Sequence, residues 1–141
     1  MKEIIGKKIN KIEMQGDTIL VFTDSENVQY VYETYGDCCS YSWFSNITGI
    51  QNLIGCIVNL VTEREEFTDF EQRKAESEYL KQNGSEPDAL SLYGYSIKTK
   101  KGTCDIEFRN ESNGYYGGEC AFSGNKPYKK NGELKEINTD F

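Results

Sequence analysis

Histidine is absent from all 141 residues of this sequence. It is the usual general base near neutral pH and the commonest metal ligand in proteins. Its absence excludes Ser-His-Asp and Cys-His catalysis and the zinc hydrolases. Carboxylate chemistry stays open because the chain has 23 acidic residues, but no calcium-loop, P-loop or dinucleotide-binding motif organises them. The sequence therefore favours binding over catalysis.

Long apolar runs and paired cysteine motifs are also missing. Residues 1–15 contain no charged-then-apolar leader, and no run approaches the roughly 18 apolar residues of a membrane-spanning helix. We therefore expect a cytoplasmic protein with no membrane partner. The five cysteines form no C-x-x-C pair, so reduced thiols are expected. In a strand, one of the adjacent Cys38 and Cys39 would face the core and the other would face outward.

Cations are scarce, because the net charge is −7 and the only arginines are Arg64, Arg73 and Arg109. Nucleic-acid-binding proteins need a basic face that releases counterions, so this balance argues against a long DNA or RNA ligand. A small phosphorylated ligand is compatible with it, since two or three well-placed cations in a pocket can hold such a ligand whatever the net charge.

Alternation of apolar and polar residues predicts an α+β protein built on two antiparallel β-meanders. The predicted strands are residues 8–13, 18–23 and 28–34 in the first meander, and 89–98, 103–109 and 115–122 in the second. The length suits a single ligand-binding domain over residues 1–123, with 124–141 as a C-terminal extension of the same domain. We expect this extension to be extended or wrapped against a partner.

The main helix is predicted over residues 68–82. Thr68 and Glu71 form a capping-box pattern, and Gly84 is a natural C-terminal stop. The apolar stripe of this helix is thin, which favours a helix that completes the core of another protomer or lies largely in solvent.

Two further segments precede this helix. Small polar residues before Trp43 indicate the start of a short helix, with Trp43, Phe44 and Ile47 as its apolar stripe. The apolar run over residues 53–61 is typical of one buried strand.

The most informative segment covers residues 106–118. It combines Arg109 with two asparagines, a serine and three glycines in a strand-turn-strand pattern. Arginine offers a rigid fork of donors to an anion, asparagine reads hydroxyls and base edges, and glycine lets backbone N–H groups approach a ligand closely. This combination suits phosphate and ribose recognition. The alternative is an ordinary Asn-Gly hairpin turn, with Arg109 paired to Glu107 or Asp105 at the sheet surface.

Scattered blocks over roughly residues 28–120 resemble a family of small phage-encoded proteins. The blocks are residues 36–40, 42–44, 94–99 and 104–117. The family includes the first-described Thoeris anti-defence proteins. These act as sponges for glycocyclic ADP-ribose, a cyclic ADP-ribose isomer that a bacterial TIR-domain enzyme makes after infection.

The resemblance implies a phage anti-defence protein in the cytoplasm of an infected bacterial host. Such a protein sequesters the cyclic ADP-ribose signal without degrading it and so blocks Thoeris immunity. A homodimer or higher homo-oligomer, with ligand pockets between protomers, is also implied. We expect no catalytic residue, metal or cofactor.

The ligand carries a pyrophosphate, two riboses and an adenine, and each needs a partner. The residues expected to bind it are Trp43, Arg109, Asn110, Ser112, Asn113, Gly114, Tyr115 and Tyr116. The arginine and the backbone N–H groups of the turn would pair with the pyrophosphate, and the asparagines and serine would read ribose hydroxyls or the adenine edge. One aromatic ring would stack on the base, although a core role is favoured for Trp43. The competing functions are a metal-dependent cyclic nucleotide phosphodiesterase and a phage inhibitor that binds a protein through its acidic helix.

Overall fold

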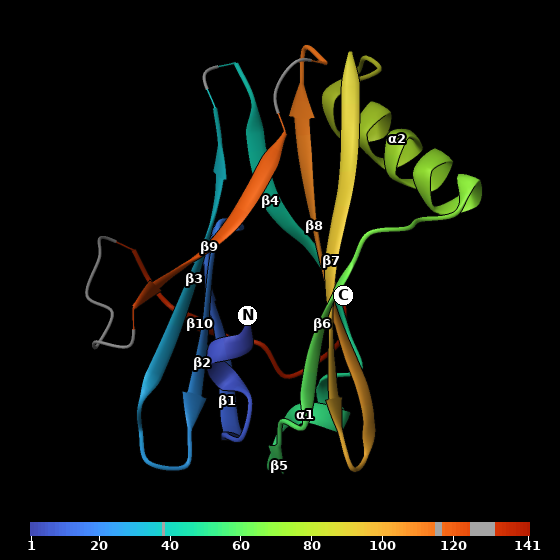
Figure 1. The fold of residues 1–141 in the computed structure, drawn as a ribbon. Coiled ribbons are helices and arrows are strands. Elements are labelled where there is room, and N and C mark those ends of the chain that lie inside the picture. Colours follow the sequence, from blue (N-terminus) through green and yellow to red (C-terminus); the bar gives the residue numbers. More distant parts are fainter. Residues whose placement is uncertain (38, 115–116, 125–131) are drawn as a thin grey trace.

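Two antiparallel sheets face one another in the computed structural model, which describes residues 1–37, 39–114, 117–124 and 132–141 (Figure 1). The larger sheet contains β1 (Lys8–Gln15), β2 (Ile19–Asp24), β3 (Gln29–Gly36), β5 (Cys56–Ile57), β9 (Gly118–Gly124) and β10 (Lys135–Glu136). The smaller sheet contains β4 (Tyr41–Thr48), β6 (Leu60–Arg64), β7 (Ala89–Thr99) and β8 (Gly102–Ser112). The helical elements are η1 (Lys2–Ile4), α1 (Ile50–Leu53) and α2 (Asp69–Asn83). The predicted α+β class with antiparallel sheets is confirmed.

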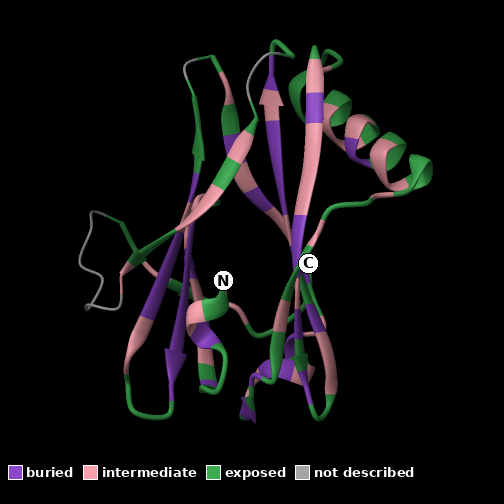
Figure 2. Cartoon of the chain, in the orientation of Figure 1, coloured by how far each residue is buried: buried purple, intermediate pink, exposed green. Residues whose placement is uncertain are grey.

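The hydrophobic core lies between the two sheets. Buried side chains from both inner faces form one cluster, and Figure 2 shows them along the facing strands. On β8, Cys104, Ile106 and Phe108 share the inner face as the alternation predicted, and each is buried. The sandwich therefore follows directly from the period-2 pattern of the strands.

The first meander is confirmed, and the second is only partly right. Strands β1, β2 and β3 pair in chain order, and β7 pairs with β8 as expected. Strand β9, however, leaves β8 and pairs with β3 in the other sheet, with Gly118 opposite Gly36. Local alternation could not decide this, because both edges of a strand offer the same backbone donors and acceptors.

The short helix expected around Trp43 is wrong, because this segment is strand β4. It pairs with β8 and carries a bulge between Phe44 and Asn46. Phe44 and Ile47 face the core, whereas Trp43 lies opposite Arg109 on the outer face. Pairing with a long neighbouring strand outweighs a local cap signal in a segment rich in aromatic residues.

The single buried strand expected over residues 53–61 is also wrong. Helix α1 ends at Leu53, and Gly55, at φ 78°, turns the chain. The two short strands that follow join different sheets, since β5 pairs with β1 and β6 pairs with β7. The local sign of this break in the sequence was Gly55 inside the apolar run, because glycine readily adopts the left-handed conformation found there.

Helix α2 is confirmed with its predicted ends. Thr68 Oγ1 accepts from the Glu71 N–H at 3.1 Å, and Glu71 Oε2 accepts from the Thr68 N–H at 2.7 Å. Gly84 ends the helix at φ 76°. The helix lies against the outer face of the smaller sheet (Figure 1), and of its side chains only Ala75 is buried.

The described part of the C-terminal extension packs on its own domain. Strand β10 pairs with β1, and Ile47 and Phe141 exchange two backbone hydrogen bonds. The Asp140 carboxylate accepts from the N–H groups of Gly49 and Ile50 at 2.9 and 3.0 Å, which caps α1. Residues 132–141 thus close over their own chain, and 125–131 lie outside the described residues.

The expectation for the adjacent cysteines can be followed at one position only. Cys38 lies outside the described residues. Cys39 is exposed and has φ 71°, so it belongs to a turn and not to a strand. Both helices of the described part are too short or too polar to cross a membrane.

Candidate functional site

The outer face of the smaller sheet carries a polar row beneath helix α2. Because cross-strand partners share a face, the pairing places Asn46, Glu107 and Gly94 side by side, with Arg64 beyond them on β6. Gly94 has no side chain, and the ring of Phe67 lies over it, 3.5 Å from where a Cβ would be. The gap between sheet and helix is a pocket of about 330 Å³.

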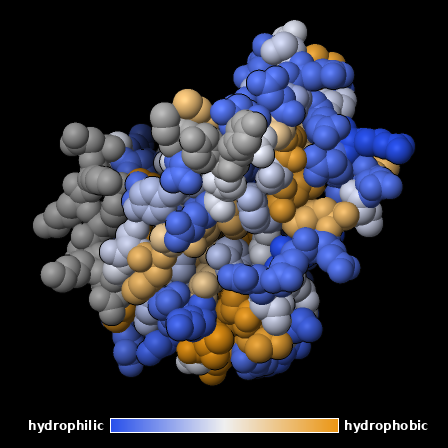
Figure 3. Space-filling view, turned by 45° about the horizontal axis from the view of Figure 1, so that its top comes forward, coloured by the Kyte–Doolittle hydropathy of each residue, from blue (hydrophilic) through white to orange (hydrophobic). Residues whose placement is uncertain are grey.

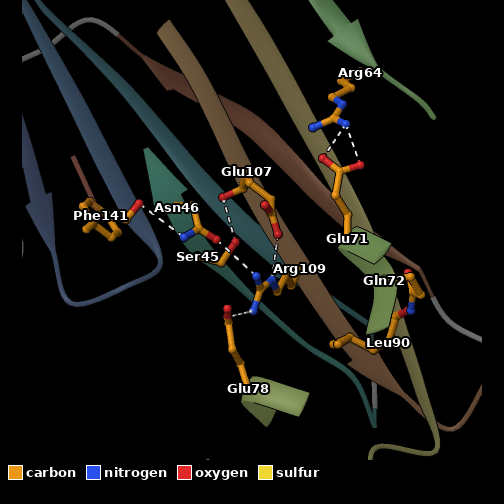
Figure 4. A network of polar contacts seen from close by, with 10 residues as sticks. All are labelled: Ser45, Asn46, Arg64, Glu71, Gln72, Glu78, Leu90, Glu107, Arg109 and Phe141. Atoms are coloured by element: carbon orange, nitrogen blue, oxygen red, sulfur yellow. Dashed lines mark hydrogen bonds and ion pairs between the residues drawn. The ribbon is translucent and has the colours of Figure 1, made fainter. Parts of the chain in front are cut away.

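Arg109 lines this pocket and is 7% exposed. Its Nε donates to Glu107 Oε1 at 2.7 Å, its Nη1 to Glu78 Oε2 at 2.8 Å, and its Nη2 to Asn46 Oδ1 at 3.1 Å (Figure 4). Burial lowers the pKa of Arg109, but its hydrogen bonds to Glu107 and Glu78 outweigh this effect and the net shift is upward. The ion pair between Arg109 and Glu107, which the alternative interpretation expected at the sheet surface, is present. The Arg109 side chain is buried, however, and Glu78 of α2 provides a second carboxylate.

Arg64 is the second arginine of the pocket. Its Nη2 donates to both oxygens of Glu71, at 2.7 and 2.8 Å, and its guanidinium lies 4.2 Å from the ring centroid of Phe67. The Thr68 N–H and then Arg64 hold the pKa of Glu71 below its ordinary value. Lys74 of α2 also lines the pocket.

Helix α2 is attached to the sheet mainly through polar contacts. Besides the two arginine–glutamate pairs, Gln72 Nε2 donates to the Leu90 carbonyl at 2.8 Å. An amphipathic helix normally packs through an apolar stripe, which α2 lacks. The ion pairs therefore define where the helix sits.

Asn110 and Ser112 lie on the opposite face from Arg109, because side chains alternate along β8. Asn110 is 0% exposed; its Nδ2 donates to Ser42 Oγ at 2.8 Å, and its Oδ1 has no hydrogen-bond partner among the described residues. Ser112 is buried, and its Oγ accepts from the Gly114 N–H at 3.0 Å. The structure therefore separates these two residues from the arginine.

The remaining residues expected from the sequence are spread around the end of β8. Trp43 is on the Arg109 face and stacks on Tyr41, with ring centroids 5.6 Å apart. Asn113 and Gly114 are exposed in the turn. Tyr115 and Tyr116 lie outside the described residues.

A second hollow, of about 470 Å³, opens between the two sheets beside β7 and β9. Tyr93 stacks on Phe108 in its wall, with centroids 4.9 Å apart, and its hydroxyl accepts from the Gly118 N–H at 3.2 Å. Burial raises the pKa of the Cys120 thiol to about 12, so this thiol is neutral and a poor nucleophile. Three exposed glutamates and one cation, Arg64, line this hollow. Three cations and four carboxylates line the arginine pocket, so the hollow is the less suited of the two to an anion.

Sequence reasoning missed most residues of the arginine pocket. Arg64 was identifiable as one of three arginines, but nothing local linked it to Arg109. Nothing in the sequence indicated that Glu78 and Lys74 line a pocket, because charged residues on a polar helix are usually exposed to solvent. No cluster of three or more carboxylate or thiol groups within the described ranges is arranged to hold a metal ion.

Comparison with known proteins gives one match. A family model described as a domain of unknown function (DUF7448) matches residues 2–122. Neither the curated proteins nor the solved structures include a match to the chain.

Proposed function

Because the chain belongs to the DUF7448 family, whose function is unknown, we propose a function from the site: the protein binds and sequesters a compact phosphorylated signal without degrading it. In this proposal, which follows the resemblance described above, the signal is glycocyclic ADP-ribose and the role is phage anti-defence against Thoeris immunity. The observation that carries the proposal is the convergence on one pocket of Arg64 and Arg109, which both belong to strands of the smaller sheet.

The chemistry of the pocket supports a ligand with a pyrophosphate. Arginine pairs with phosphate oxygens through two parallel N–H donors, and such charge-assisted bonds are the strongest available to a buried dianion. A volume of about 330 Å³ falls within the usual range for small-molecule sites. The ring of Phe67 adds an apolar surface beside the cations.

The same pocket also contains carboxylates that neutralise its arginines. Glu71 holds Arg64, while Glu78 and Glu107 hold Arg109. A phosphate must therefore compete with a carboxylate for the guanidinium. Of the residues expected from the sequence, Arg109 lines this pocket, so the proposal assigns the pyrophosphate to it and to Arg64.

A second candidate function is binding to a protein partner through α2. Phe70 on this helix is 76% exposed and Leu80 is 41% exposed. Figure 3 shows other hydrophobic side chains in small patches on a largely hydrophilic surface. Exposed aromatic side chains anchor many protein interfaces. Homo-oligomerisation is likewise a proposal, which light scattering after size exclusion would measure.

The proposal is tested by ligand retention. Purified protein is incubated with TIR-generated glycocyclic ADP-ribose, free ligand is removed, and the protein is heat-denatured so that released molecules can be separated by chromatography. Intact ligand in protein-stoichiometric amount supports the proposal. A cleaved product would make the protein an enzyme, and no retained or altered ligand would favour the protein partner.

A matched pair of variants tests whether retention depends on a cation of the pocket. Arg64→Ala removes a pocket cation, whereas Arg73→Ala removes an exposed cation from the same region outside the pocket. We expect retention to fall in the first variant and to persist in the second. Equal retention in both would remove the ligand from this pocket.

A further inference from the structure

Glu78 contacts Arg109 from helix α2, whereas Glu107 and Asn46 contact it from strands of the sheet. Glu107 lies two residues away on the same strand, and Asn46 lies on the neighbouring strand β4. Glu78 reaches toward Arg109 from α2, outside the sheet (Figure 4). Its side chain is 37% exposed, compared with 24% for Glu107. Of the two carboxylates on Arg109, Glu78 is therefore the one that can leave without disturbing a strand.

The carboxylate of Glu78 also has the chemistry of a phosphate oxygen. Its Oε2 accepts from Arg109 Nη1 at 2.8 Å, the distance of a charge-assisted hydrogen bond. Arginine recognises carboxylate and phosphate groups with the same planar fork of donors. A phosphate oxygen at this position would restore the same contact.

The attachment of α2 permits such an exchange. Ala75 is its one buried side chain, and the Arg64–Glu71 pair that also holds it has side chains 39% and 34% exposed. Ion pairs at this level of exposure contribute little to stability. The helix itself is capped at both ends, so it can stay helical when its contacts with the sheet are lost.

We infer that Glu78 occupies a phosphate subsite of the pocket when no ligand is bound, and that α2 is a cover that ligand phosphate releases from the sheet. This inference rests on the proposed function, since it describes the regulation of the same site. It makes the ligand-free protein self-inhibited, because binding must first break the Arg109–Glu78 pair. The ligand class is a compact pyrophosphate, because both arginines line the same pocket.

The inference is tested by titration calorimetry with inorganic pyrophosphate as the probe. Glu78→Gln removes the competing charge and leaves Arg109 in place, so the affinity for pyrophosphate should rise about tenfold above wild type. Glu76→Gln is the matched control, because it makes the same charge change two residues away and contacts Gln72 instead of an arginine. Circular dichroism and melting temperature establish that both variants are folded. An equal change in both variants, or no change in either, would overturn the inference.

Hydrogen exchange tests the movement of the helix directly. With glycocyclic ADP-ribose bound, the amides of residues 69–83 should exchange faster than in the free protein, because α2 has lost its contacts with the sheet. Unchanged or slower exchange in a protein that retains the ligand would overturn the cover while leaving the proposed function intact. If the wild-type protein retains no ligand, the proposed function is wrong. A gain of pyrophosphate affinity in Glu78→Gln alone would still support the inference that Glu78 occupies a phosphate subsite.

Discussion

At the scale of single residues, Arg109 joins three parts of the molecule. Its guanidinium connects β8 to α2 through Glu78 and to β4 through Asn46. The amide nitrogen of Asn46 in turn donates to the Phe141 carbonyl at 3.2 Å. A residue expected to meet a ligand thus also has a structural role, and the two roles need separate measurements.

Arg109→Ala should lower the free energy of unfolding by roughly 2 kcal/mol, because it leaves two carboxylates close together without their cation. Arg73→Ala, at an exposed position on α2, should change it by less than about 0.5 kcal/mol. Urea unfolding measures both values. If the two variants unfold at the same urea concentration, the ion pairs of Arg109 are not stabilising.

At Gly118, the start of β9 lies close to strands β4 and β8 of the other sheet. A Cβ added there would lie 2.6 Å from Ser42 Oγ and 2.8 Å from Asn110 Cβ. We expect Gly118→Ala to destabilise the fold by roughly 1–3 kcal/mol through overpacking. In the control, Gly117→Ala, the new Cβ meets only the Tyr93 hydroxyl, at 3.0 Å, so the loss should be smaller. Thermal unfolding compares them, and a larger loss in the control would contradict this account.

At the scale of elements, α2 shows a helix determined by its ends and not by an apolar face. The capping box and the left-handed glycine account for where it starts and stops. Glu71 has two roles, because the carboxylate that caps the helix also binds Arg64. Its charge therefore links the start of the helix to the sheet.

Lowering the pH should weaken the contacts that the Glu71 carboxylate makes at the start of α2. The folded-state pKa of this carboxyl lies below its ordinary value of 4.5, so its ionised form stabilises the folded protein. That contribution is complete above pH 4.5 and is lost as the pH falls through the lowered pKa. The stability difference between wild type and Glu71→Gln should therefore shrink as the pH is lowered below 4.5. A charge-matched change at the exposed Glu66 should show no comparable trend; an identical trend would point to net charge instead.

At the scale of the whole molecule, the described end of the chain closes the fold. Asp140 caps α1, and the backbone N–H groups of Gly49 and Ile50 hold the pKa of its carboxyl below the ordinary value. This contact links two segments that lie about 90 residues apart in the chain. Residues 132–141 are therefore packed on β1 and β4.

Asp140→Ala should cost roughly 1 kcal/mol of stability, the usual value of a helix N-cap. Thr139→Ala changes an exposed neighbour and should be close to neutral. Chemical denaturation measures the difference. If Asp140→Ala is also neutral, solvent caps α1 equally well.

The sequence alone determined the features that depend on near neighbours. Period-2 alternation located the strands of the first meander and the β7–β8 hairpin, and the Thr68, Glu71 and Gly84 signals located α2. These are local because side-chain direction and capping are decided within a few residues. The absence of histidine limited the chemistry in the same direct way.

Tertiary structure alone decided which edges pair and which charges meet. It moved β9 to the other sheet, made β4 a strand, and placed Arg109 and Asn110 on opposite faces of β8. It also brought Glu78 and Arg64 to one pocket from elements with no local relation to Arg109. Backbone edges are chemically alike and charged side chains act through space, so neither choice is written in a short window of sequence.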